Sequence, residues 1–336
     1  ARVLVLDNHD DFGGHAKRNE FTVDGQTQIA YGGTESIDTP SSYTEISKAL
    51  LKDIGVDVQR FYDYYDQDLY DKMGLSYGIA FDEKTYGERK LVTGYGSRPW
   101  KEFVAETPLS KIAKDDLLRA FTDKRDYLPG MSRDEKIALL SKISYHSYLK
   151  DYVKVDEQVL EMYQRWGMSY WCVGMDEVPA IYILGYTDGG GMPGLQHTVQ
   201  QEDGRGVEPY IFHFPDGNAS VARLLVRSLI PAALPGSTME DSVTARLDYS
   251  QLDKDGAPCR IRLNSTVVNA AHSKDSKSVN VTYVHSGDTH TVRAKKCIMA
   301  CYNSAIPYIC SDLPDKQKAG LAYNVKVPLT YTKVMV

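Results

Sequence analysis

Apolar residues open the chain in a run that ends in a carboxylate. Residues 3–6 alternate Val and Leu, and Asp7 follows them directly. A run of this length and composition predicts a β-strand. In a dinucleotide-binding sheet, a carboxylate at the end of the second strand accepts hydrogen bonds from the ribose hydroxyls. We therefore expect residues 2–7 to form a strand and Asp7, at its end, to lie at a nucleotide site; capping of the following loop is the alternative role for Asp7.

A Gly-Gly pair follows this strand at a short distance. Gly13 and Gly14 precede His15 and two further basic residues. Glycines allow backbone N–H groups to approach a pyrophosphate closely, and basic side chains add donors and positive charge beside it. A tight turn without a ligand is the alternative interpretation. The candidate cofactor-binding residues of this stretch are Asp7, Asn8, Gly13, Gly14, His15 and Arg18.

A predicted hairpin and a second Gly-Gly element come next. Residues 21–29 alternate around Asp24-Gly25, a pair that tolerates the positive φ of a two-residue turn. The Gly-Gly pair that follows precedes hydroxyl and carboxyl side chains. These residues predict either flavin or pyrophosphate contact or a simple connection from hairpin to helix. The candidate cofactor-binding residues here are Gly32, Gly33, Thr34, Glu35 and Ser36.

Helical periodicity dominates the next part of the chain. Over residues 41–54 the apolar side chains recur at helical spacing, so that they share one face; they are Ile46, Ala49, Leu50 and Ile54. From about residue 58 to residue 200, helical segments are joined by loops rich in Gly, Pro and Tyr. Ser132 and Glu135 predict a capping box at the start of one helix. The predicted helices cover residues 114–121, 133–148 and 156–166.

The α/β pattern returns near residue 210. Asp216-Gly217-Asn218 forms a turn before an apolar helix over residues 219–230, and we interpret this turn as structural. Alternation of apolar and polar residues downstream predicts β-structure. The predicted elements are a bulged strand within residues 259–270, a hairpin over residues 279–294 and a buried strand over residues 296–300.

Taken together, these patterns predict an α/β protein whose nucleotide-type sheet is interrupted by a mostly helical insertion. We place the boundaries where the pattern changes. The predicted parts are residues 1–57, 58–205, 206–306 and 307–336.

Composition narrows the possible partners. The formal net charge of −6 over 336 residues argues against a nucleic-acid partner. No apolar run approaches the roughly 18 residues that a transmembrane helix needs. The five cysteines include no C-x-x-C pair, so we expect buried structural thiols and no metal site.

Five ordered strings carry a family resemblance: FGGHAKRNEF, YGGTESID, DYLPGMS, FPDGNASVARLLVRSLIP and ACYNSAIPYI. In this order they resemble the flavin-dependent amine oxidase superfamily, and within it the spermidine dehydrogenase family. The resemblance implies an FAD/NAD(P)-binding Rossmann-like domain of the amine oxidase type. Residues 1–57 and 206–306 would then bind FAD, residues 58–205 would form the substrate domain, and residues 307–336 would begin a second substrate-domain segment. It also implies cofactor contacts from Val267, Ala300, Cys301 and Tyr302.

The resemblance further implies the chemistry. Members of the family oxidise an amine, here a polyamine such as spermidine, by hydride transfer from the α-carbon to flavin N5, and water then hydrolyses the imine. For the spermidine dehydrogenases it implies an additional haem b, and by analogy with bacterial members a periplasmic location. His146 is the residue considered for haem ligation, although packing is the favoured role for a helical histidine. The electron acceptor is left open.

One motif of the family is missing. The Gly-x-Gly-x-x-Gly turn that should precede the first strand by roughly 20 residues occurs nowhere in the chain, and residue 336 falls in mid-domain. We therefore interpret the sequence as a fragment. We expect the chain as given to bind FAD weakly or not at all and to be inactive.

A site for a polyamine substrate requires aromatic faces and carboxylates, because both attract ammonium groups. Because the flavin itself accepts the hydride, we assign no catalytic side chain. Rival interpretations are another flavin enzyme on this scaffold, such as an amino-acid oxidase or a carotenoid desaturase, and a non-catalytic remnant. The best local match to a substrate site is Tyr170, Trp171, Asp176 and Glu177, for which core packing of the two aromatic residues is the alternative.

Overall fold

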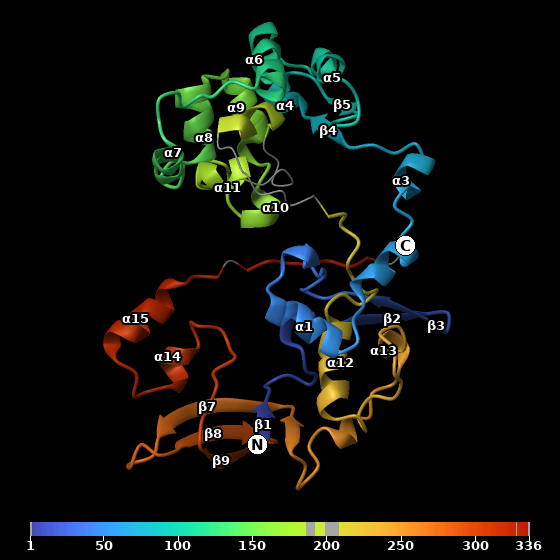
Figure 1. The fold of residues 1–336 in the computed structure, drawn as a ribbon, viewed down its shortest axis with the longest axis vertical. Helices are drawn as coiled ribbons and strands as arrows, with labels where there is room; N and C mark the ends of the chain where they lie inside the picture. The colour runs from blue at the N-terminus through green and yellow to red at the C-terminus, as the bar shows by residue number, and fades with distance from the viewer. Residues whose placement is uncertain (1, 186–191, 199–207, 327, 335–336) are drawn as a thin grey trace. The chain divides into compact units, whose positions relative to one another are not determined.

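The computed structural model describes residues 2–185, 192–198, 208–326 and 328–334. The chain forms two compact units (Figure 1). Unit 1 comprises Ala1–Tyr65 and Val207–Val336, and unit 2 comprises Asp66–Gly206. The predicted insertion began at residue 58, and the structure places this boundary later. The reason is Phe61, which is 2% exposed and packs against Phe212 and Phe214 of unit 1.

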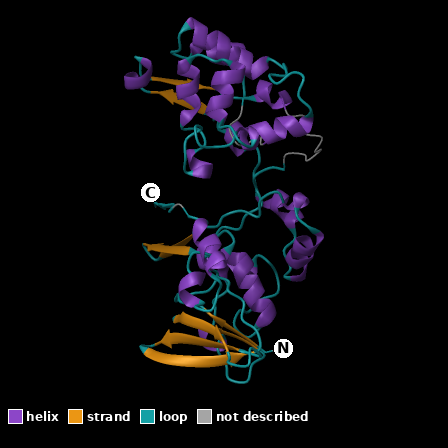
Figure 2. Cartoon of the chain, turned by 90° about the vertical axis from the view of Figure 1, so that its left-hand side faces the viewer, coloured by secondary structure: helices purple, strands orange, loops and turns teal. Residues whose placement is uncertain are grey.

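In the part of unit 1 that the structure describes, the strands form three small sheets. Strand β1 (Val3–Leu6) pairs in parallel with β6 (Cys259–Arg262). Strands β2 (Asn19–Val23) and β3 (Gln26–Ala30) form an antiparallel hairpin. The third sheet, the largest group of strands in Figure 2, is the antiparallel meander β7 (Ser265–His272), β8 (Val279–His285) and β9 (Asp288–Ala294).

The helices of unit 1 are mostly short. The longest is α12 (Ala219–Leu229), which buries Leu224 and Val226 in separate apolar clusters of the unit. The α-helices are α1 (Glu45–Asp53), α2 (Phe61–Tyr64), α12, α13 (Asp241–Thr244), α14 (Ile306–Ile309) and α15 (Asp315–Tyr323). The 3₁₀-helices are η1 (Gly14–Ala16), η2 (Pro40–Ser42), η3 (Val58–Arg60) and η7 (Tyr249–Gln251).

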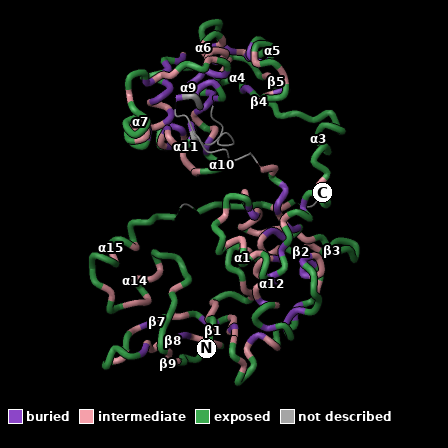
Figure 3. The backbone as a smooth tube through the Cα atoms, in the orientation of Figure 1, coloured by how far each residue is buried: buried purple, intermediate pink, exposed green. Residues whose placement is uncertain are grey.

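Among its described residues, unit 2 consists of helices around one large core and the antiparallel pair β4 (Gly78–Phe81) and β5 (Lys90–Thr93). Three tyrosines, Tyr145, Tyr148 and Tyr163, are fully buried in that core, which appears purple in Figure 3. The helices are α3 (Leu69–Lys72), α4 (Glu83–Tyr86), α5 (Trp100–Glu106), α6 (Lys111–Thr122), α7 (Arg133–Leu140), α8 (Tyr145–Ser147), the π-helix η4 (Tyr148–Val153), α9 (Glu157–Gln164), α10 (Met168–Trp171), α11 (Ala180–Gly185) and the 3₁₀-helix η6 (Pro193–Thr198).

Several local predictions are confirmed. Asp24 and Gly25 have positive φ and join β2 to β3, and Ser286-Gly287 joins β8 to β9 in the same way. The capping box at α7 is present, because the Ser132 hydroxyl accepts from the Glu135 N–H while the Glu135 carboxylate accepts from the Ser132 N–H. These features depend on residues close in sequence, so local chemistry decides them.

Three predictions of strand and helix structure are wrong. The bulged strand over residues 259–270 is two strands in different sheets, because Asn264 adopts a φ of 51° and turns the chain between them. Residues 296–300 form no strand, and Ile298 is 89% exposed. No strand lies beside this segment among the described residues, and a strand requires a neighbour to satisfy its N–H and C=O groups. The helix predicted over residues 133–148 ends at Leu140, and α8 and η4 follow it.

Most of the apolar face predicted for residues 41–54 stays exposed, and no residue of helix α1 itself is fully buried. Ile54 is 9% exposed and Leu51 packs beside it. Ile46 and Leu50 are 84% and 50% exposed. The helix therefore meets its core only along the Leu51–Ile54 side, although the apolar spacing of the sequence includes both residues that remain outside.

The four sheets are small and separate among the described residues. The chain is mixed α/β, and the Rossmann-like architecture stays a prediction. No helix that the structure describes is long and apolar enough to cross a bilayer.

Candidate functional site

The two Gly-Gly elements lie against each other in unit 1. Gly13 and Gly14 have φ values of 100° and 57° and start η1. The Gly33 N–H donates to the His15 carbonyl oxygen over 2.9 Å. A Cβ atom on Gly32 would lie 1.9 Å from the Lys17 carbonyl oxygen, so only glycine fits there. Backbone packing against the first element thus explains Gly32 without a ligand.

The first element leaves backbone donors free. The N–H groups of Ala16 and Lys17 close the turn onto the carbonyls of Gly13 and Gly14. Among the described residues, the N–H groups of Gly14 and His15 have no protein acceptor. Nothing lies within 4 Å of the position that a Gly14 Cβ would take. Successive free N–H groups in an open turn with positive φ are suited to binding an anion.

The start of α12 joins both elements. A Cβ on Gly13 would lie 3.2 Å from the Ala222 Cβ. The Asn218 N–H donates to the Thr34 carbonyl oxygen over 3.1 Å, and its side-chain Nδ2 donates to the Ser36 carbonyl oxygen over 3.0 Å. The glycine-rich segments therefore gather at the N-terminus of an eleven-residue helix, where the helix dipole favours negative charge.

A buried charged cluster lies under this region. The Asp216 side chain is fully buried; one oxygen accepts from the Ser220 hydroxyl over 2.7 Å, and the other lies 3.5 Å from Arg18 Nη1. Burial raises the pKa of Asp216. Burial, with the nearby charge of Arg18, lowers the pKa of Arg223. The Arg223 Nε donates to the Ser242 carbonyl oxygen over 2.7 Å, so the cluster links α12 to α13.

The Arg18 guanidinium is already engaged by other groups of the same chain. Its guanidinium contacts Glu20, the Val243 carbonyl oxygen and Asp216. Its side chain is 16% exposed. Direct binding of a phosphate by Arg18 therefore stays a prediction, and its geometry supports a role in holding the Asp216 carboxylate.

Asp7 lies at the carboxyl end of β1, as its position after the apolar run implies. Its Oδ1 accepts from the N–H of His9 over 2.9 Å and lies 2.9 Å from the His9 Nδ1. Its Oδ2 has no partner among the described residues and can accept from a ligand hydroxyl. Asn8 beside it is exposed. Val267 is half-buried in β7, next to the register shift between Val267 and Asn269.

The loop after residue 299 reaches the first Gly-Gly element. The Tyr302 hydroxyl contacts the His15 ring, and the two ring centroids are 5.5 Å apart. Ala300 and Cys301 are exposed. Residues separated by most of the chain therefore meet at His15, and of the predicted group 300–302 only Tyr302 makes this contact.

The predicted substrate residues belong to unit 2. Tyr170 is 66% exposed, and its ring lies 5.6 Å from that of Trp171. Asp176 accepts from the Gln164 side chain over 2.6 Å, and Glu177 is exposed. Trp171 packs against the unit 2 core. Among the described residues, no hydrogen bond joins the two aromatic residues to the two carboxylates, and a shared substrate site for the four stays a prediction.

The cysteines differ from expectation. Cys297 and Cys301 are exposed and the other three are half-buried, so the prediction of buried thiols is wrong. Cys297 lies within residues 296–300, which form no strand, and Cys301 follows them directly. Within the described ranges, no three His, Cys, Asp or Glu side chains come together as a metal site. His146 lies 3.2 Å from the Gln164 side-chain oxygen, measured from Nδ1.

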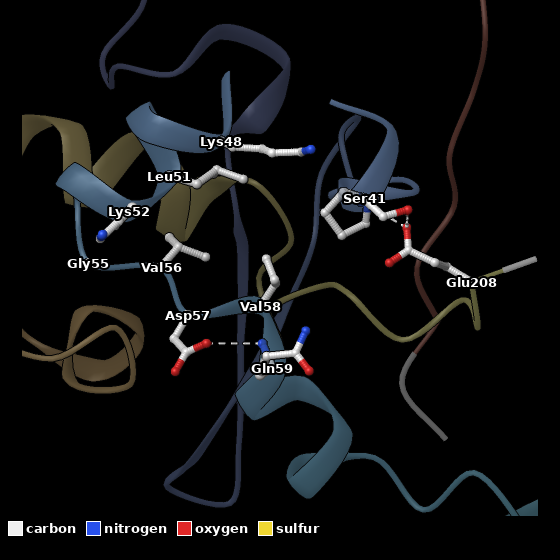
Figure 4. A pocket seen from close by; sticks show the side chains of 11 residues that line it. Ser41, Lys48, Leu51, Lys52, Gly55, Val56, Asp57, Val58, Gln59 and Glu208 are labelled. Carbon is white, nitrogen blue, oxygen red and sulfur yellow. Dashed lines mark hydrogen bonds between the residues drawn. The ribbon is translucent and has the colours of Figure 1, made fainter. Parts of the chain in front are cut away.

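An open groove of about 600 Å³ lies elsewhere in unit 1, between α1 and the segment around η2 (Figure 4). Lys48 and Lys52 line it together with Asp57 and Glu208. Glu208 accepts from the Ser41 N–H and hydroxyl over 2.9 and 2.7 Å. None of the candidate cofactor-binding residues lines this groove.

Sequence reasoning assigned no cofactor role to Asp216, Asn218 or Arg223. Asn218 nevertheless bonds the segment after the second Gly-Gly pair, Asp216 contacts Arg18 after the first, and Arg223 links α12 to α13. The sequence did contain one signal of the buried cluster. Arg223 and Arg227 lie four residues apart in a mostly apolar helix, and a charge that is buried needs a polar partner. No protein-family model matches the chain, and no curated protein matches it.

Proposed function

We propose that this chain carries the nucleotide-binding part of an FAD-dependent amine oxidoreductase acting on a polyamine such as spermidine. The observation that supports the proposal best is the meeting of the two Gly-Gly elements at the start of α12, with the Gly14 and His15 N–H groups free. The residues fit the nucleotide half of FAD. Gly14 and His15 would donate to the pyrophosphate, and the Asp7 Oδ2 would accept from a ribose hydroxyl.

FAD, when bound, would accept the hydride equivalent from the amine α-carbon. The chain's own residues would position the cofactor and balance the charge around it. The buried Asp216 lies 3.5 Å from the Nη1 of Arg18, the basic residue that follows the first Gly-Gly turn along the chain. The His15–Tyr302 contact ties the loop after residue 299 to the same turn. A non-catalytic binding protein would share this geometry, so activity must be measured.

The test is an absorption spectrum of the protein purified as expressed from its complete gene, before and after addition of spermidine. We expect a flavin band that bleaches on addition of spermidine, and a Soret band if a haem is also bound. A protein that stays colourless after incubation with FAD would contradict the proposal. A flavin band that no amine bleaches would favour another flavin enzyme.

In the protein purified for this spectrum, a charge at Gly14 should weaken FAD binding specifically. Gly14→Asp places a carboxylate in open space beside the two free N–H groups, and we expect about tenfold weaker binding, or about 1.4 kcal/mol. Gly14→Asn matches its shape and tolerance of positive φ without the charge. Gly256→Asp adds the same charge at another open turn with positive φ. Equal FAD affinity for Gly14→Asp and Gly14→Asn would contradict a pyrophosphate at this turn.

A further inference from the structure

Two histidines lie beside each other near the turn of the β8–β9 hairpin. His285 is the last residue of β8, and His290 lies near the start of β9. His290 pairs with Tyr283, two residues before His285, so both histidines project from the same face of the hairpin. Their ring centres are 6.3 Å apart, and the rings are inclined at 63°. The strand register therefore brings two imidazoles together.

The surroundings of His285 fix which of its ring nitrogens can bind a ligand. Its Nδ1 lies 3.2 Å from the Asn264 carbonyl oxygen and 3.0 Å from the Ser265 hydroxyl oxygen. Because a carbonyl oxygen only accepts, this contact places the proton of the neutral ring on Nδ1 and the lone pair on Nε2. A hydrogen bond from one ring N–H to a carbonyl orients metal-binding histidines in the same way. Among the described residues, the His285 Nε2 has no hydrogen-bond partner.

The His290 ring is exposed and is held only by stacking. Its centre lies 5.3 Å from that of the buried Tyr283 ring, and within the described ranges its nitrogens make no hydrogen bond. Arg262 donates to the Tyr283 hydroxyl, and its Nε also donates to Asp253 over 2.6 Å. The carboxylate of Asp253 thus balances the positive charge of Arg262 beneath the two histidines. A cation at the histidine pair would therefore not face an unpaired arginine.

The separation of the two rings is compatible with one shared metal ion. A zinc–nitrogen bond of about 2.0–2.1 Å places the metal about 3.2 Å from the centre of each imidazole. The centres of two rings on one ion are then about 5.2 Å apart at a tetrahedral angle and at most about 6.4 Å apart. The observed 6.3 Å lies within this range, and rotation of the exposed His290 ring would shorten it.

We propose that His285 and His290 form a binding site for a divalent transition-metal ion such as Zn²⁺, with water at the remaining positions. Imidazole nitrogens suit zinc, copper and nickel, whereas magnesium and calcium take oxygen ligands. Asp288 lies directly across from His285 in the register and adds negative charge on the same face. No three protein ligands meet among the residues that the structure describes, so we expect weaker binding than at a structural site with four protein ligands. The inference is independent of the proposed function, since it involves neither FAD nor oxidation.

The test is titration of the full chain with zinc chloride, followed by ¹H–¹⁵N spectra of ¹⁵N-labelled histidine rings. We expect the ring signals of His285 and His290 to shift together with one midpoint, while His285 keeps its Nδ1 proton. His290→Gln should weaken zinc binding at His285 about tenfold, because even loss of a group that only supports a ligand has this effect. His272→Gln, which removes an exposed histidine from the same sheet, should leave the midpoint unchanged.

The strand register supplies a second control. The double variant His290→Gln, Thr291→His keeps the number of histidines, but the new ring projects from the opposite face of the hairpin. It should bind zinc as weakly as His290→Gln alone. Because His290 is exposed, we expect both variants to fold, and unchanged backbone amide spectra verify this.

Three results would overturn the proposal. One is equal zinc affinity for His290→Gln and the unchanged chain. Another is a different midpoint for each of the two rings, which would mean that they do not share one ion. The third is an equal response to magnesium chloride, which would mean that the carboxylates attract any divalent cation.

Discussion

Replacing Gly32 by alanine is expected to lower the free energy of unfolding by about 3 kcal/mol, the upper end of the cost of overpacking. The new Cβ would lie 1.9 Å from the Lys17 carbonyl oxygen and 3.3 Å from that of His15. Both neighbours are backbone atoms, so no side chain can rotate away. The Lys17 carbonyl must move by more than 1 Å, which would break the hydrogen bond from Gly33 to His15. Denaturant unfolding measures the loss.

Gly320→Ala is the matched control for this substitution. Gly320 lies within α15 and has nothing within 4 Å of its Cβ position. Alanine there should stabilise the helix by up to about 1 kcal/mol, because glycine is a poor helix former. A Gly32→Ala variant as stable as Gly320→Ala would mean that the two Gly-Gly elements do not pack as the structure shows.

The two Gly-Gly pairs, Gly13-Gly14 and Gly32-Gly33, show how much of this region the sequence could predict. Gly-Gly pairs mark places where the backbone must approach something closely, and this was foreseen at both pairs. The identity of the partner was not. The sequence suggested a ligand at Gly32, whereas the nearest group is the Lys17 carbonyl oxygen. At Gly14 the space is open, so a ligand at this glycine stays a prediction.

Local turns and caps were predictable, whereas burial of single segments was not. The hairpin at Asp24-Gly25 and the capping box at Ser132 follow from residues a few positions apart. Whether residues 296–300 form a strand depends on a neighbour from elsewhere in the fold. Ile46 shows the same limit, because its position in an apolar helical pattern says nothing about which side of the helix a core covers. Its 84% exposure follows from tertiary packing alone.

Arg223→Met is the second substitution with a large expected effect, a loss of about 3 kcal/mol of unfolding free energy, the upper end of the cost of leaving buried acceptors without a donor. Arg223 is 7% exposed and donates to the carbonyl oxygens of Ser242 and Ala245. Methionine keeps the length of the side chain and the helix propensity, but it leaves both carbonyls without this donor. It also leaves the buried Asp216 with Arg18 as its remaining cation. Some of the loss is offset because Arg223 no longer has to be buried with a charge.

Arg246→Met provides the control, because Arg246 is exposed in the same unit and a surface substitution of this kind changes stability by no more than about 0.5 kcal/mol. Denaturant unfolding of the two variants separates the buried cluster from a general effect of lost positive charge. A loss below about 1 kcal/mol for Arg223→Met would mean that water reaches the two carbonyls once the guanidinium is gone. The cluster would then not hold α12 against α13, and the Gly-Gly turns would need another support. The expected larger loss would instead identify Asp216 and its two arginines as the buried frame on which the candidate anion site is built.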